Sequence, residues 1–501
     1  MNIRNYFLIL TGAMLMLGAC GSNGGSGEPP VTPQDSVPTV PETKGDVVVL
    51  VTTETRGFDL TEQSAELKSG SSMAQTNIRL NPNEQYQEID GFGAAITGST
   101  CYNLMQMSAA DRAKFLTETF SPSKYGFSYV RISIGCSDFS LSEFTCCDKE
   151  GIENFALQSE DKEYVIPILK EILAINPQLK IMGTPWTCPR WMKVEKRGSN
   201  KPYNSWTSGS LNPKYYQDYA TYFVKWIQVF KAEGIDIYSI TPQNEPLNKG
   251  NSASLYMEWD EERDFVKVLG KAMRDANIDT KIFVFDHNYN YDNISSQTDY
   301  PVNIYDDAEA SQYITGAAYH NYGGNKSELL DIHNKAPQKQ LVFSETSIGE
   351  WNKGRDLKAR LIDDMKEVAI GTVNNWCRGV IVWNLMLDSD KGPNRPDGGC
   401  QTCYGAVDIS VSDFKTITRN SHYYILAHMA SVVKPGAVRI ATSGYTDSSI
   451  TFAAFLNTDN TYGFVIANEA NTAKRITISS EGKYFSYEFP ARSVTSLKWA
   501  K

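Results

Sequence analysis

From about Gln87 to Gly436 the chain alternates short β-type runs with amphipathic helical stretches, and this alternation limits the possible folds more than any other feature. Regular strand–helix alternation is typical of a parallel sheet with crossover helices. Eight runs have strand character, which predicts an α/β fold, a closed (β/α)8 TIM barrel over residues 86–435. The predicted strands are 88–92, 128–134, 180–184, 237–241, 281–285, 314–320, 340–345 and 379–385.

Helix signals separate these runs. Asn212 is the predicted N-cap of a helix whose first turn contains Pro213; an apolar face follows at helical spacing, and Gly234 ends the pattern. Ser108, with an acidic residue three positions later, has the spacing of a capping box and predicts another helix start. The last helix of the alternating part is predicted at 423–433.

After Gly436 the chain changes to short alternating segments separated by Asn, Asp, Gly and Ser, which is typical of antiparallel strands. Segments 46–53 and 76–80, ahead of the barrel, have the same character. We therefore predict an accessory antiparallel β-sandwich built from both chain ends, residues 46–85 and 436–501. Its predicted C-terminal strands are 449–455, 463–467, 475–479 and 486–489.

The first twenty residues resemble an export signal. Arg4 precedes an apolar run that ends in Leu17-Gly18-Ala19-Cys20, as in a bacterial lipoprotein signal. We expect removal of residues 1–19 and lipidation of Cys20, so that a lipid anchor is the only membrane contact of an exported lipoprotein in the outer membrane, cell surface or periplasm. An uncleaved membrane helix is the alternative, but the run is shorter than about 20 residues. Residues 20–45, rich in Gly, Ser, Pro and Thr, are predicted to form a flexible linker.

Composition and charge exclude several functions. A net charge of -10 without Lys/Arg clusters argues against a nucleic-acid partner. The five His are scattered without zinc-site spacing, so we expect no metal. We also expect no cofactor and a monomeric protein. Cys400 and Cys403 could form a structural disulfide or stay free thiols; a metal site is disfavoured because no second CxxC or His pair lies nearby.

Two glutamates close predicted strands at the rim where a barrel keeps its chemistry. Glu245 follows the fourth run and Glu345 ends the seventh, so both face the C-terminal end of the barrel. Two carboxyl groups can cut a glycosidic bond if one attacks and the other donates a proton. We assign Glu345 as nucleophile and Glu245 as acid/base, because Asn244 beside Glu245 can hold a sugar 2-hydroxyl. In isolation, a Glu at a strand end is more often a salt-bridge partner or a loop cap.

Motifs spread over the barrel region resemble glycoside hydrolase family 30, which includes glucosylceramidases and β-1,6-glucanases. The resemblance runs from about Gln87 to the end of the chain and implies a retaining glycosidase with a side β-sandwich. The motifs are Gly91-Phe92-Gly93-Ala94-Ala95, Arg131 to Ser140, Thr184 to Lys193, Thr241 to Pro246, Tyr319 to Tyr322 and Trp383 to Leu385.

The resemblance also implies roles for individual residues. Trp186 matches a tryptophan that contacts sugar hydroxyls in the reactive subsite, and Trp383 matches a platform on which the sugar ring stacks. His320 and Tyr322 match residues that flank the nucleophile. For Arg131, at the second strand, charge chemistry leaves two roles open: it holds the nucleophile ionised, or it forms a structural ion pair.

One position departs from the family pattern. Glucosylceramidase-like members carry an Asp that grips hydroxyls of the terminal glucose where this chain has Gly98. The change removes one or two charge-assisted hydrogen bonds of about 1.5–3 kcal/mol each, and we expect it to open space beside the reactive sugar. A sugar whose O6 carries another unit needs such space, so we expect an endo-acting β-1,6-glucanase with a β-glucan or glucoside substrate. An exo-acting β-glucosidase, glucosylceramidase-like or β-xylosidase enzyme is the alternative.

Three loops could shape the cleft. The 193–211 loop, with Tyr203 and Trp206, and the segment Asp286-His287-Asn288 could line leaving-group subsites or be ordinary surface residues. The 390–404 loop is expected to form one wall. A non-catalytic, carbohydrate-binding surface lipoprotein is the rival from another class. It would explain the lipid signal and the aromatics, but it has no use for paired glutamates at strand ends.

Overall fold

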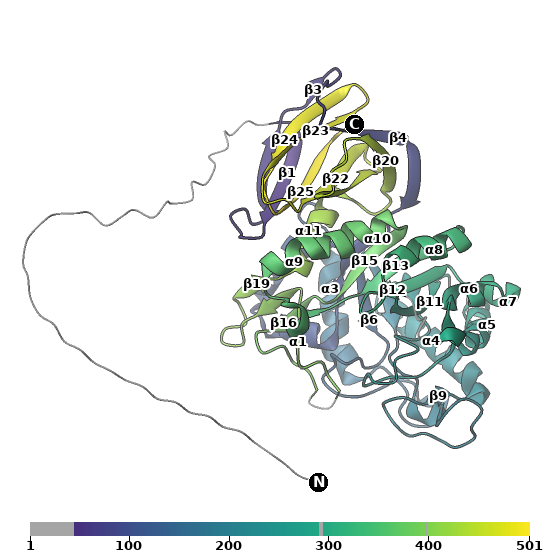
Figure 1. Cartoon of the computed structure of the whole chain (residues 1–501). Helices are drawn as coiled ribbons and strands as arrows, with labels where there is room; N and C mark the ends of the chain where they lie inside the picture. Colours follow the sequence, from purple (N-terminus) through teal and green to yellow (C-terminus); the bar gives the residue numbers. More distant parts are fainter. Residues whose placement is uncertain (1–44, 290–293, 396–397) are drawn as a thin grey trace, which may run out of the picture. The chain divides into compact units, whose positions relative to one another are not determined.

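The computed structural model describes residues 45–289, 294–395 and 398–501 (Figure 1). The expectations for the signal, for Cys20 and for nearly all of the linker therefore lie outside the described residues. Within the described ranges, no helix is both long and apolar enough to cross a membrane.

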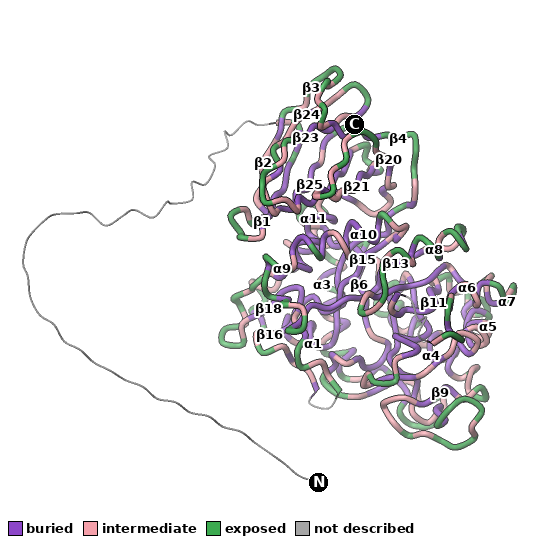
Figure 2. Tube along the Cα trace, in the orientation of Figure 1, coloured by how far each residue is buried: buried purple, intermediate pink, exposed green. Residues whose placement is uncertain are grey.

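Eight parallel strands close into the predicted barrel (Figure 1). Tightly packed side chains from neighbouring strands fill its centre, among them Tyr129, Met182, Phe283 and Val342. The barrel interior is therefore a core, and the chemistry is left to the rim. Figure 2 shows these strands as the buried centre of the barrel. In barrel order the strands are β10 (Ser239–Ile240), β11 (Lys281–Asn288), β12 (Gly316–His320), β13 (Gln340–Glu345), β15 (Cys377–Asn384), β5 (Gly91–Ala95), β6 (Tyr129–Ser133) and β7 (Lys180–Thr184).

The helices between the strands begin where the capping signals predict. The Asn212 side chain accepts a hydrogen bond from the Lys214 N–H at the start of a 3-10 turn that leads into α4, and Ser108 accepts one from the Asp111 N–H ahead of α2. The helices are α1 (Gly98–Gln106), α2 (Ala109–Phe120), α3 (Ile166–Ile175), α4 (Tyr216–Ala232), α5 (Trp259–Asp275), α6 (Tyr300–Tyr305), α7 (Ala308–Ser311), α8 (Ser327–Lys335), α9 (Leu357–Asp364), α10 (Ile370–Asn374) and α11 (Ser421–Val432).

Strands from both chain ends form a second, mainly antiparallel sheet of ten strands. It encloses its own apolar core, which includes Val49, Ile78, Phe464 and Trp499. Its order is β2 (Thr61–Ala65), β1 (Val47–Thr53), β25 (Ser493–Ala500), β22 (Thr461–Asn468), β21 (Ile450–Leu456), β20 (Val438–Gly444), β4 (Asn77–Glu88), β23 (Lys474–Ser480), β24 (Lys483–Phe489) and β3 (Lys68–Ser69).

The passage from this sheet to the barrel differs from the prediction. Glu88 pairs with Val438 in the antiparallel sheet, so β4 continues to Glu88 where a strand ending at residue 80 was predicted. The first barrel strand consequently begins at Gly91, three residues later than predicted. Gly91 has a φ of 146°, a conformation that only glycine adopts readily, and this residue marks the change of direction.

Helix α11 joins the two parts. Its residues are buried except for Ser431, which is half-buried, because one side faces the barrel and the other faces the sheet. The His428 ring reaches Ser496 Oγ at 2.8 Å through Nδ1 and Thr52 Oγ1 at 2.9 Å through Nε2. Burial lowers the pKa of His428 to about 3, so this joint contains a neutral imidazole.

Candidate active site

Glu245 and Glu345 meet at one end of the barrel, as predicted. Glu245 follows β10 and Glu345 is the last residue of β13, and each is only 5% exposed. One oxygen from each carboxylate and one ring nitrogen of His320 all lie within 4.8 Å of one another. Retaining glycosidases hold their two carboxyl groups about 5–5.5 Å apart, and this pair is equally close.

Glu245 is surrounded by hydrogen-bond donors. Asn248 and Asn251 donate to its Oε2 at 2.7 and 2.8 Å, and Nδ1 of His320 lies 3.2 Å from its Oε1. Burial raises the pKa of Glu245, but the hydrogen bond from His320 and the neighbouring histidine charges outweigh that effect and bring it to about 2. In the free site the Glu245 carboxylate is therefore ionised and accepts hydrogen bonds.

Glu345 has different partners. Arg131 Nη1 lies 2.5 Å from its Oε2, and the Tyr322 hydroxyl donates to its Oε1 at 2.9 Å. Burial raises the pKa of Glu345; the charges of His320 and Arg131 oppose that rise and the charge of Glu245 adds to it. The oxygen atoms of Glu345 are thus held in one orientation by an ion pair on one side and a phenol on the other.

Arg131 makes the contacts that both of the roles left open by the sequence would require. Its side chain is fully buried, and besides Glu345 it contacts Asp286 Oδ2 at 2.8 Å and Asn244 Oδ1 at 2.7 Å. Its guanidinium also lies 4.8 Å from the ring centre of Trp186. It is therefore a structural ion pair beneath the site and a direct partner of the predicted nucleophile.

Asp286 is fully buried, so neither of the two roles left open for it, a leaving-group subsite or an ordinary surface residue, fits the structure. A register shift in β11 and positive φ values at Phe285 (74°) and Asp286 (50°) turn its carboxylate into the barrel. There it accepts hydrogen bonds from Arg131, from Thr241 Oγ1 at 2.8 Å and from Ser344 Oγ at 2.6 Å. Asp286 thus anchors the underside of the site.

His320 links the carboxylates. Its Nε2 lies 3.0 Å from Asp286 Oδ1 while Nδ1 faces Glu245. Burial lowers the pKa of His320, but the charge of Glu345 and the hydrogen bonds to Asp286 and Glu245 raise it to about 9. Glu245, His320 and Glu345 are close enough to share a metal ion. At this pKa the His320 ring is protonated at neutral pH, and both of its nitrogens are then hydrogen-bond donors.

The predicted aromatic residues also gather here. Trp186 and Trp383 stack on each other with ring centres 5.1 Å apart and an angle of 29°, and both are at most 5% exposed. Asn244 uses its Oδ1 on Arg131, which leaves its amide N–H groups for a ligand. Tyr322 is 43% exposed and forms an open edge of the site.

Asp138 is a site residue that was not predicted. Burial and the negative charges of Glu345 and Glu245 raise its pKa to about 8. Its Oδ1 is buried and has no hydrogen-bond partner among the described residues. In the sequence, only its position within the motif from Arg131 to Ser140 could have indicated that Asp138 belongs to the site.

The space expected at Gly98 is filled, so that expectation is wrong. A Cβ atom on Gly98 would lie 1.9 Å from Oε1 of Glu160. The Leu141 N–H holds that carboxyl through Oε2 at 2.7 Å, and burial raises the pKa of Glu160 to about 7. A side chain at position 98 would have to displace the Glu160 carboxyl, which occupies that place, so no opening for a substrate branch results.

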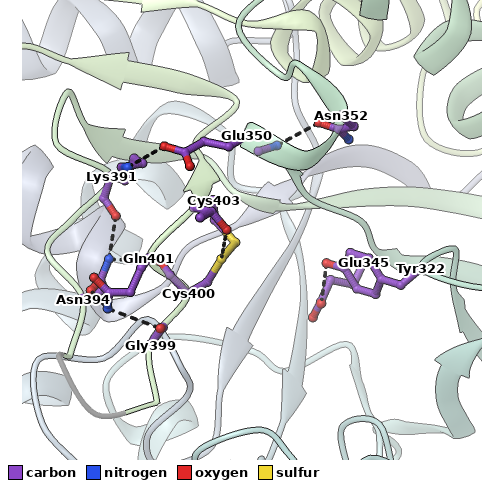
Figure 3. Close-up of a disulfide and its surroundings, with 12 residues drawn as sticks. Tyr322, Glu345, Glu350, Asn352, Lys391, Asn394, Gly399, Cys400, Gln401 and Cys403 are labelled. Atoms are coloured by element: carbon purple, nitrogen blue, oxygen red, sulfur yellow. Dashed lines mark hydrogen bonds and ion pairs between the residues drawn. A yellow bond between two sulfur atoms is a disulfide. The ribbon is translucent and has the colours of Figure 1, made fainter. Parts of the chain in front are cut away.

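Cys400 and Cys403 form the disulfide that was one of the two expected states (Figure 3). The bridge closes a turn of four residues directly ahead of a short strand pair. Strand β17 (Cys403–Tyr404) pairs with β14 (Ile348–Gly349), and Lys391 forms an ion pair with Glu350 at 2.7 Å. Cys403 belongs to the apolar cluster that contains Trp186 and Trp383.

Two glutamates this close at the rim of a barrel are the arrangement with which glycosidases hydrolyse sugars, so fold and site define a glycoside hydrolase. The comparisons then show which one: the chain belongs to glycoside hydrolase family 30. Residues 89–433 match the glycosyl hydrolase family 30 TIM-barrel domain, and residues 436–497 match the family 30 beta sandwich domain.

Individual relatives cover most of the chain. A solved structure described as the endo-beta1,6-glucanase BT3312 is 67% identical with a TM-score of 0.89, and the match covers 91% of this chain and 100% of that one. Endo-1,6-beta-D-glucanase BGN16.3 of Trichoderma harzianum is 31% identical over 82% of this chain and 84% of its own length. Lysosomal acid glucosylceramidase of Mus musculus is 24% identical over 85% and 83%.

Proposed function

We propose that the protein is a retaining endo-β-1,6-glucanase. The observation that carries the mechanism is the approach of the two carboxylates within 4.8 Å, which leaves no room for the separate water that an inverting enzyme places between them. The linkage is supported by the relatives named endo-1,6-glucanases, above all the one that is 67% identical.

Glu345 attacks the anomeric carbon of the bound glucosyl unit in the first step, and Glu245 gives a proton to the departing oxygen. A covalent glycosyl-enzyme forms on Glu345. Water then attacks the same carbon while Glu245 takes its proton, which releases a product with the original β configuration. Asn244, whose oxygen is held by Arg131, donates to the 2-hydroxyl of the reacting sugar.

The proton that Glu245 delivers needs a source, because the pKa of this glutamate is low in the free site. His320 is the group that holds a proton there, 3.2 Å from Glu245. Bound sugar displaces the water around the three carboxylates of Asp286, Glu345 and Glu245. The negative charge on Glu245 is then less well stabilised. Transfer of the His320 proton to Glu245 then leaves a neutral acid next to the leaving oxygen.

The mode of attack is tested by the size of the early products. Linear β-1,6-glucan is expected to break into a ladder of oligosaccharides before glucose accumulates, because an endo-acting enzyme cuts at internal bonds. Chromatography of products at a few per cent conversion measures this. Glucose as the sole early product would instead indicate an exo-acting β-glucosidase, the activity class to which the glucosylceramidase-named relative points. Parallel assays with aryl β-glucoside and aryl β-xyloside separate the remaining alternatives.

We also propose that Cys20 carries a lipid that anchors the exported protein to a membrane, with residues 1–19 removed. The support is the apolar run that ends in Leu17-Gly18-Ala19-Cys20. Growth with a labelled fatty acid is expected to label the wild-type protein, and the variant Cys20→Ser should stay unlabelled and leave the membrane fraction. Equal labelling of both proteins would contradict the proposal.

A further inference from the structure

A cavity of about 600 Å³, lined in part by Gly250 and Ser252, has no part in the mechanism above. This volume is within the range of about 300–1,000 Å³ that small-ligand sites occupy. Its lining combines one indole ring with polar and charged side chains and no aliphatic ones. The lining residues used below are Glu143, Arg190, Asn204, Trp206 and Ser252.

The cavity is on the side of the site where a leaving group departs. Asn251, which donates to Glu245 at 2.8 Å, stands between Gly250 and Ser252, and both of these line the cavity. Glu245 is the proposed proton donor to the leaving oxygen. The part of a glucan chain released in the first step therefore leaves toward this cavity.

Trp206 is held firmly at this place. The Ser254 N–H donates to the Trp206 carbonyl at 2.9 Å, and the buried Lys193 ammonium donates to the carbonyls of Ser205 at 3.0 Å and Ser254 at 2.8 Å. The indole is half-buried against the cluster that contains Trp186 and Trp383. Because the loop is already fixed, little conformational entropy is lost when a ligand binds to the ring of Trp206.

Arg190 lies over this ring, with its guanidinium carbon 4.3 Å from the ring centre of Trp206. Among the residues that the structure describes, no carboxylate or carbonyl accepts a hydrogen bond from this guanidinium. Its N–H donors are therefore available to a ligand, whereas most other cations near the site are paired. An aromatic face and free donors side by side suit a sugar, which has an apolar C–H face and a rim of hydroxyls.

We propose that this cavity binds the glucosyl units on the reducing-end side of the cleaved bond, with Arg190 and Trp206 as the specificity-determining pair. The inference rests on the proposed function and deepens it. Trp206 stacks against a sugar ring, Arg190 donates to its hydroxyls, and Glu143 and Asn204 supply further polar contacts at the edge. The pair thereby favours long chains over short substrates.

The test compares substrates that fill the cavity with one that does not. For Trp206→Ala and Arg190→Ala, kcat/KM is measured on linear β-1,6-linked glucose oligomers of increasing length and on an aryl β-glucoside, whose leaving group contains no sugar. We expect kcat/KM on the longest oligomers to fall about tenfold, roughly the contribution of one aromatic contact. On the aryl glucoside it should stay within about twofold of wild type.

Trp259→Ala is the matched control, because Arg263 lies over the Trp259 ring at 5.3 Å in the same kind of pair, on α5 and outside the cavity lining. It should lower neither rate. An equal loss of kcat/KM on all substrates, or no loss on any, would overturn the inference. If Trp206→Ala fails to fold, the result for Arg190→Ala decides. If wild type does not cleave β-1,6-glucan, the proposed function fails separately, and the length series is run on the β-glucan that it does cleave.

Discussion

Replacing Glu345 by alanine is expected to lower kcat on β-glucan by about 10⁴-fold or more, because the covalent intermediate can no longer form. Glu345→Gln should lose turnover to a similar extent and keep its affinity for the substrate, since the amide preserves the shape of the site. A carbohydrate-binding protein without catalysis would have no turnover to lose. Initial rates and oligosaccharide binding by calorimetry, measured on the same preparations, separate these cases.

Azide distinguishes the roles of the two glutamates. In Glu345→Ala, azide can attack from the face that the carboxylate vacated and give the α-glucosyl azide from an activated aryl β-glucoside. In Glu245→Ala the glycosyl-enzyme still forms, so azide should trap it as the β-glucosyl azide. Tyr322→Phe keeps both carboxylates and serves as the control without rescue. The β-glucosyl azide from Glu345→Ala and the α-glucosyl azide from Glu245→Ala would reverse our assignment of nucleophile and acid/base.

The barrel and the carboxylate pair could be predicted because they depend on local patterns. Strand-like runs at regular spacing imply a closed parallel sheet, and the residue that ends a run in such a sheet must lie at the C-terminal rim. That rule places Glu345, which ends a run, and Glu245, which follows one, at the same rim, although 100 residues separate them in the chain. The capping signals at Ser108 and Asn212 are local in the same sense, and the structure confirms both.

What could not be predicted depends on contacts between distant residues or on unusual backbone geometry. Asp286 reads as a loop residue after a strand, and only the bulge at Phe285 turns it under the site. The absence of a side chain at Gly98 reads as open space, yet Glu160, from a helix 62 positions away, fills it. Neither the bulge at Phe285 nor the approach of Glu160 leaves a mark in the local sequence.

Arg131 is where stability and catalysis depend on the same charge, and Arg131→Met is expected to damage both. The methionine would leave the carboxylates of Glu345 and Asp286 buried without their shared cation. Breaking a buried ion pair by removing one partner destabilises a protein by about 3–5 kcal/mol. The free energy of unfolding at pH 7, from denaturant titration, should fall by this amount, and kcat should fall because Asn244 and Glu345 lose the group that orients them.

The effect should also depend on pH, with a sign that identifies charge as its cause. In the wild type, burial acts to raise the pKa of Asp286, but Arg131 and His320 hold this pKa well below its usual range. The ionised Asp286 therefore stabilises the fold at every pH above the unfolded pKa of about 3.9. This stabilisation is lost in strong acid. Without Arg131 that pKa moves upward, and the variant loses stability as pH rises above about 4. The deficit of Arg131→Met should therefore be smaller near pH 4 than at pH 7. Arg131→Lys, which keeps the charge but not the fork that reaches three partners, should be intermediate at pH 7. A deficit of equal size at both pH values would mean that lost packing, and not lost charge, accounts for the role of Arg131.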